Sequence, residues 1–113
     1  MNTFEMKLQP KYCIKLAEGT KTIEVRLFDD KRRQIKIGDI IEFQSADDQK
    51  NKIKTEVIGL LNYKTFSDLF SDIPSDYFGE ENKETLLQII SKFYSKELEE
   101  KYTVLGIKIK LVK

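Results

Sequence analysis

Five stretches of alternating or β-branched apolar residues constrain the fold of this chain most strongly. Alternation with a period of two is typical of a strand that lays one face on a core. Turn residues separate the stretches, as at Gly38-Asp39, and Gly59 predicts a bulge or bend within the longest one. The predicted strands are Thr3–Leu8, Lys21–Leu27, Ile40–Phe43, Ile53–Tyr63 and Thr103–Val112. We therefore expect a sheet of about five to six mostly antiparallel strands.

Helical segments interrupt this pattern at two points. After the first strand, Pro10 suits the first turn of a helix and Gly19 suits its C-terminal cap. Before the last strand, Thr65 or Ser67, then Asn82, and then Ser95 can each cap a helix. The apolar stripe expected to pack in the core comprises Leu86, Ile89, Ile90 and Phe93. The chain is thus predicted to be α+β, one domain over residues 1–113, with a sheet that curls into a small barrel.

Missing residue types restrict the chemistry. The 113 residues include no histidine, which excludes Ser-His-Asp and Cys-His enzymes and zinc sites of the His/Cys type. Cys13 is the single cysteine and is expected to be a small core residue. We expect no cofactor and no metal. No apolar run approaches the ~20 residues that span a bilayer, and the N-terminus lacks the features of a signal peptide, so we expect a cytoplasmic protein without a membrane partner.

The net charge of +1 conceals an asymmetry along the chain. Residues 1–36 carry nine Lys/Arg and five Asp/Glu, whereas residues 65–100 carry three Lys and nine Asp/Glu. The first block suits an anionic partner such as a phosphate backbone. Both blocks could equally be solvated surface, and the acidic block could instead be a surface for another protein. The sequence leaves the oligomeric state open between a monomer and a weak dimer.

The segment from Gly19 to Arg26 carries the densest group of charged residues on a predicted strand. The strand period places Glu24 and Arg26 on one face, and Lys21 lies at the strand entrance. Such a set beside a glycine can form a pocket for a polar or anionic ligand. By spacing alone, the charged outer face of an edge strand would look the same.

The spacing Gly19-x-Lys21-x-x-Glu24-x-Arg26 resembles the G-x-K-x-x-E-x-R signature of the ASCH domain, a branch of the PUA-like β-barrels. The resemblance extends over nearly the whole chain and implies a PUA-like fold. Further matching segments are Pro10-Lys11-Tyr12, Arg26-Leu27-Phe28-Asp29, Arg32-Arg33, Ile37-Gly38-Asp39-Ile40-Ile41-x-Phe43, Tyr63-x-x-Phe66-x-x-Leu69-Phe70 and Phe93-Tyr94-Ser95-x-Glu97-x-Glu99-x-x-Tyr102.

The resemblance implies RNA or a nucleotide-like small molecule as partner, held in a cleft lined by Lys21, Glu24 and Arg26. An alternative implied function is a small-amide hydrolase that acts on an acylated nucleoside such as N4-acetylcytidine. That branch uses the motif lysine, a threonine where this chain has Glu24, and a glutamate from the helical insertion, here Glu80 or Glu81.

The identity of residue 24 separates these two functions. A glutamate beside Lys21 keeps the lysine protonated, which suits ligand binding and makes it a poor nucleophile. Glu24 could itself act as a general base for water, and this version of an enzyme remains open. An enzyme should show a closed pocket in which Lys21 meets a carboxylate from residues 80–81. A binding module should show an open, basic groove.

Further ligand contacts are expected outside the motif. Lys31, Arg32 and Arg33 form a basic cluster that could contact phosphate or simply be a solvated turn. Tyr63 could stack on a base, as could Tyr94 and Tyr102, although packing against the core is the alternative for each.

Overall fold

The computed structural model describes residues 2–48 and 50–112 and contains one five-stranded sheet in the order β1-β3-β4-β5-β2. β1 pairs with β3 in parallel, and every other neighbouring pair is antiparallel. The strands are β1 (Thr3–Leu8), β2 (Ile23–Leu27), β3 (Ile40–Ser45), β4 (Lys52–Tyr63) and β5 (Val104–Leu111). The predicted α+β class and mostly antiparallel sheet are confirmed, although β2 begins two residues later than its predicted strand.

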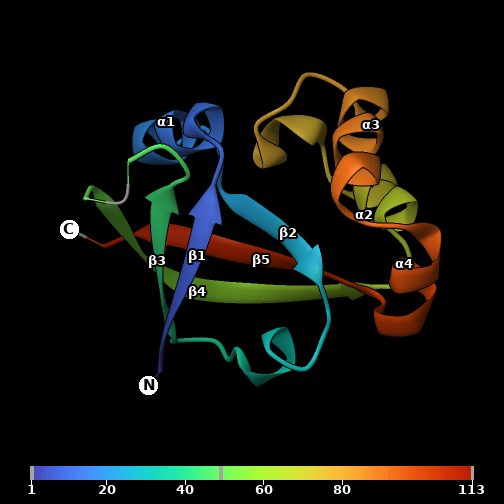
Figure 1. Ribbon diagram of the computed structural model, residues 1–113, viewed down its shortest axis with the longest axis horizontal. Coiled ribbons are helices and arrows are strands. Elements are labelled where there is room, and N and C mark those ends of the chain that lie inside the picture. The colour runs from blue at the N-terminus through green and yellow to red at the C-terminus, as the bar shows by residue number, and fades with distance from the viewer. Residues whose placement is uncertain (1, 49, 113) are drawn as a thin grey trace.

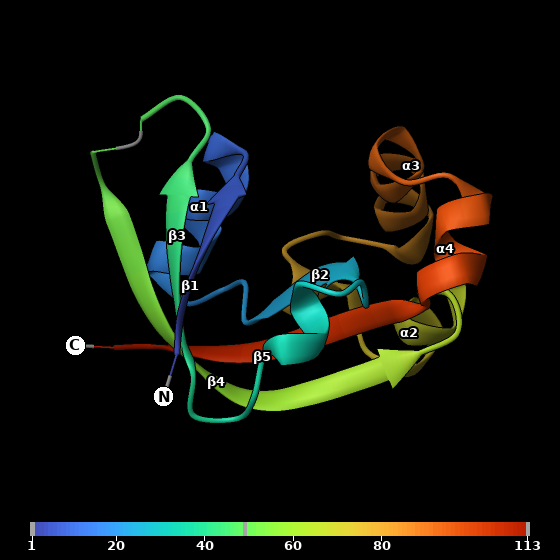
Figure 2. The same cartoon turned by 60° about the horizontal axis from the view of Figure 1, so that its bottom comes forward.

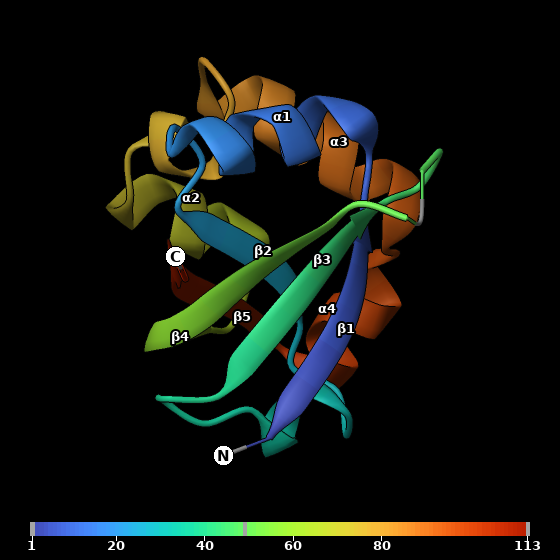
Figure 3. The same cartoon turned by 90° about the vertical axis from the view of Figure 1, so that its left-hand side faces the viewer.

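The sheet curls because its longest strand bends. The register of β4 against β5 shifts between Val57 and Gly59, as expected for a bulge beside this glycine. In Figures 1 and 2, β1 and β3 stand across the direction of β4 and β5, so that the sheet forms a half-barrel. Figure 3 shows β1, β3 and β4 side by side along one wall. The two edge strands, β1 and β2, are left at the open side.

The described helices lie at the two predicted insertion points. Gly19 ends the first helix with a φ of +83°, a conformation that glycine adopts without a Cβ clash. The side chains of Thr65, Asn82 and Ser95 accept hydrogen bonds from the first turns of the next three helices, as predicted, with Thr65 in place of Ser67. The helices are α1 (Pro10–Glu18), α2 (Phe66–Asp72), α3 (Lys83–Phe93) and α4 (Lys96–Tyr102), with 3-10 turns η1 (Arg32–Gln34) and η2 (Ser75–Phe78). None of these helices is both long and apolar enough to cross a membrane.

Two hydrophobic cores share the sheet. The first lies inside the curl, where α1 contributes Cys13 and Leu16 and β5 contributes Leu105 and Ile107. The second lies between the sheet and helices α2 and α3, and Val25 of β2 belongs to it. The side chains of β2 therefore point alternately towards the helical core and towards the interior of the half-barrel.

The predicted core stripe of α3 is wrong at its end. Leu86 is buried, but Ile89 and Ile90 are only partly buried and Phe93 is 56% exposed. The physical reason is that only one face of α3 packs on the second core, with Leu86 buried and Leu87 and Ile90 partly buried against it. Ile89 and Phe93 line a space opposite β1 and α1, where apolar side chains remain accessible.

We expect this difference to appear in stability measurements. Leu86→Ala should lower the free energy of unfolding by about 2–5 kcal/mol, because it leaves a cavity in the second core. Phe93→Ala should change it by no more than about 0.5 kcal/mol, because its ring is mostly in water. Urea denaturation followed by circular dichroism measures both, and equal losses would contradict the exposed position of Phe93.

Candidate functional site

A cleft opens between the two edge strands and α3. It has a volume of about 160 Å³. The end of β1 and the start of α1 form one side, β2 forms the floor, and α3 forms the opposite side, an arrangement visible in Figure 2. The lining residues are Lys7, Leu8, Gln9, Tyr12, Glu24, Val25, Arg26, Ile89, Ile90, Phe93 and Tyr94.

Glu24 lies at the centre of the charged part of this cleft. Its side chain is 8% exposed and lies between Lys21 and Arg26. Lys21 Nζ is 3.2 Å from Oε1, while Arg26 Nη2 is 2.6 Å and Nε 2.8 Å from Oε2. Two cations around one carboxylate leave the cluster with a net charge of +1.

The electrostatics of the cluster favour the charged forms of Glu24 and Arg26. Burial alone would raise the pKa of Glu24, but the charges of Lys21 and Arg26 and their hydrogen bonds outweigh burial and hold this pKa below its usual range. Burial likewise acts to lower the pKa of Arg26, and the Glu24 carboxylate, with a contribution from Tyr94, raises it overall. The carboxylate is thus a permanent counterion for both cations at neutral pH.

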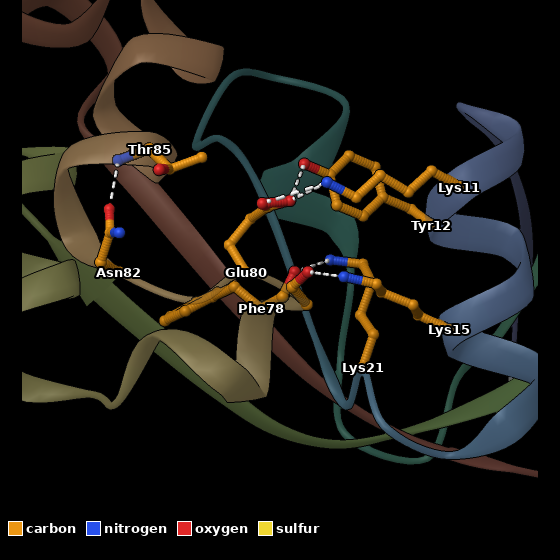
Figure 4. Close-up of polar contacts among 9 residues, drawn as sticks. Lys11, Tyr12, Lys15, Lys21, Phe78, Glu80, Asn82 and Thr85 are labelled. Carbon is orange, nitrogen blue, oxygen red and sulfur yellow. Dashed lines mark hydrogen bonds and ion pairs between the residues drawn. The ribbon is translucent and has the colours of Figure 1, made fainter.

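Lys21 uses its donors inside the protein. Nζ donates to the backbone carbonyls of Ile23 (2.8 Å) and Phe78 (3.2 Å) and pairs with Glu24. An ammonium group has three donors, so these partners occupy all of them. Figure 4 shows Lys21 reaching the carbonyl of Phe78, beside Lys15, which donates to the carbonyl of Gly79. Lys21 therefore fixes the η2 segment against β2.

A second polar cluster adjoins the first through Tyr12. The Tyr12 hydroxyl lies 3.3 Å from Glu80 Oε1, and Lys11 Nζ forms an ion pair with the same carboxylate (Figure 4). Burial and the neighbouring Glu80 raise the pKa of Tyr12 to about 12. Lys21 Nζ lies 5.3 Å from the centre of the Tyr12 ring.

Of the two predicted acids, Glu80 is buried here and Glu81 is exposed. Glu80 bonds to Lys11 and Tyr12, whereas the carboxylate paired with Lys21 is Glu24.

The predicted basic cluster divides into different environments. Lys31 and Arg32 line a shallow groove with Lys7 and Arg26, so this groove continues directly from the cleft. Arg32 is paired with Asp29 at 2.9 Å. The guanidinium of Arg33 instead stacks over Phe28, 4.3 Å from its ring centre, and Arg33 lines neither the cleft nor the groove.

The tyrosines are distributed differently from the prediction. Tyr63 lies away from the cleft, where its hydroxyl donates to Asp72 at 2.8 Å. Tyr94 lines the cleft and stacks on Phe66. Tyr12 and Phe93 line the cleft as well, although the sequence pattern assigned both to apolar helix faces. Tyr12 belongs to the matching segment Pro10-Lys11-Tyr12, which is a sequence signal for its position, whereas the spacing of apolar residues does not show that Phe93 is exposed.

In residues 2–48 and 50–112, no three acidic or cysteine side chains come together in a way that could hold a metal ion. The polar side chains that line the cleft are those of Lys7, Gln9, Tyr12, Glu24, Arg26 and Tyr94, and its other walls are apolar.

Comparisons with known proteins give a family and a fold. Residues 6–113 match the ASCH domain family. The hypothetical protein PH0355 is 36% identical, with 97% of this chain and 99% of that chain covered and a TM-score of 0.87. Protein PF0455 from Pyrococcus furiosus is 33% identical, with 98% of both chains covered and a TM-score of 0.78. An ASCH domain from Lactobacillus crispatus, 12% identical, shares the fold with a TM-score of 0.64 over 97% of this chain and 79% of that one. No curated protein matches the chain significantly.

We expect Glu24→Gln to lower the free energy of unfolding by about 3–5 kcal/mol near pH 7, because it leaves two buried cations without a counterion. Since the folded-state pKa of Glu24 is depressed, its contribution is fully present above the unfolded pKa of about 4.3 and is lost as pH falls towards the folded value. Urea denaturation at about pH 7 and about pH 3 should therefore show a smaller acid-induced loss for the variant than for the wild type. Equal acid-induced losses of stability in the two proteins would contradict the depressed pKa of Glu24.

Proposed function

Because the chain belongs to the ASCH domain family, which is associated with RNA binding, we propose that its cleft binds RNA or a nucleotide-like ligand. The observation that carries the proposal is the position of Arg26 at the border between the cleft and the basic groove. Its Nε and Nη2 donate to Glu24 and to the carbonyl of Lys7, which holds the guanidinium plane in place. These two bonds leave the Nη1 donors for a phosphate, on a guanidinium that also interacts with the Tyr94 side chain.

The surroundings of Arg26 suit the two chemical halves of a nucleotide. On the groove side lie the cationic side chains of Lys7, Lys31 and Arg32 with one carboxylate, that of Glu5, so the balance of charge favours a phosphate. On the cleft side lie the rings of Tyr12 and Phe93, which favour a flat apolar surface such as a base. Glu24 does not repel the anion strongly, because Lys21 and Arg26 balance it. Arg33 and Tyr63 take no part in this arrangement.

Binding fits the geometry better than hydrolysis by Lys21. A nucleophilic lysine needs a free lone pair, and the three donors of Lys21 are already engaged. Glu80 is not among the residues that line the cleft, and it pairs with Lys11. These contacts match neither a closed pocket that joins Lys21 to Glu80 nor a fully open basic groove. They match a narrow cleft with a basic rim.

The binding proposal predicts that Arg26→Lys weakens the affinity for a short single-stranded RNA by about tenfold. The lysine preserves a charge beside Glu24 but loses the fork that reaches the ligand. Arg33→Lys is the matched control, and it should change the affinity less than about twofold. Fluorescence anisotropy at two salt concentrations measures both. Equal affinities for wild type and Arg26→Lys would contradict the role of Arg26.

The same geometry predicts no hydrolysis of N4-acetylcytidine that depends on Lys21. Lys21 cannot attack the acyl carbon while it donates to two carbonyls and a carboxylate. Liquid chromatography of the released cytidine tests this. Turnover by the wild type that disappears in Lys21→Ala would contradict the proposal and support the hydrolase.

A further inference from the structure

β2 has a free backbone edge in the floor of the cleft. Its hydrogen bonds to β5 involve the even-numbered positions, as at Thr22 and Phe28. The N–H and C=O groups of odd-numbered residues therefore point away from β5, towards the open side of the sheet. Lys21 occupies the carbonyl of Ile23. Val25 is the next odd-numbered residue, and among the described residues no side chain or loop bonds to its backbone groups.

The opposite edge of the sheet faces the same cleft. The carbonyl of Lys7, on the free side of β1, accepts a hydrogen bond from Arg26 Nη2 at 2.8 Å. The side chain of Arg26 thus crosses the space between the two edge strands. An added peptide strand would have to run along this space and would meet Arg26, so the edge at Val25 is open to a compact group and closed to an extended chain.

The volume of the cleft matches that of a single ring. A cavity of about 150 Å³ holds one benzene molecule. The cleft has about the same volume, 160 Å³. The ring of Tyr12 and the apolar side chains of Ile89 and Phe93 line it. Val25 lines the same cleft, so a planar six-membered ring between these side chains can turn its rim towards the β2 edge.

We infer that the unpaired N–H and C=O of Val25 are the specificity-determining groups of the cleft. In an extended strand these two groups of one residue point in the same direction, so they present a donor beside an acceptor. Their complement is a single ring with an acceptor beside a donor, as on the pairing edge of a pyrimidine. The inference rests on the proposed function, and it adds that the cleft recognises the pairing edge of the ligand's ring.

The test changes one atom on each side of this contact. Uridine 5′-monophosphate is the probe, and its N3-methyl derivative lacks the donor that would meet the Val25 carbonyl. On the protein, Val25 is replaced by the corresponding α-hydroxy acid, which converts its amide N–H into an ester oxygen. The same replacement at Leu27 is the matched control, because it also removes a free-edge N–H of β2, but Leu27 does not line the cleft. Circular dichroism checks that both esters fold.

Calorimetry should show that N3-methylation and the Val25 ester each weaken binding about tenfold, since each leaves one polar group unpaired. The Leu27 ester should change the affinity less than about twofold. If the wild type binds uridine 5′-monophosphate but neither change weakens it, or if adenosine 5′-monophosphate binds more tightly, the inference alone is overturned. If the wild type binds neither nucleotide nor short RNA, the proposed function fails as well.

Discussion

The burial of Glu24 between Lys21 and Arg26 is the interaction on which the remainder of the site depends. Removing charges from water is costly, and the cluster is stable only because each group finds close partners of opposite charge and further hydrogen bonds. Lys21 extends the cluster to the carbonyl of Phe78, which ties the helical insertion to β2. Arg26 extends it to Lys7, which ties β2 to β1. One carboxylate thus links β2, the floor of the cleft, to β1 on one side and to the η2 turn that precedes α3 on the other.

The cleft follows from the topology of the sheet. A half-barrel has two edges, and this one leaves β1 and β2 facing each other without pairing. Exposed edges generally need protection from pairing with other chains. Here the side chain of Arg26 bridges the edges, and α3 stands over β2. The same protection leaves a small space with free backbone groups, apolar walls and a basic rim, and these features suit the proposed nucleotide ligand.

Local signals in the sequence predicted most of the fold. Period-two alternation located the strands, and Gly19 and Asn82 marked helix ends because their local hydrogen bonding is decided within a few residues. The prediction that Phe93 packs in the core was wrong, because periodicity identifies an apolar helix face but does not show what covers it. The saturation of Lys21 could not be predicted, since its partner carbonyl at Phe78 is 57 residues away. The free edge at Val25 is a backbone property that no side-chain pattern reports.

Chemical-shift mapping of the ¹⁵N-labelled protein with a short uridine oligonucleotide locates the binding site directly. If the ligand binds in the cleft, the shifted amides should cluster at the end of β1, along β2 around Val25, and in the last turn of α3. Shifts should be small around Ile58 and Tyr77, which line a separate groove beside η2 and β5. Shifts centred on that groove, or no shifts at all, would contradict the claim that the cleft between the two sheet edges is the binding site.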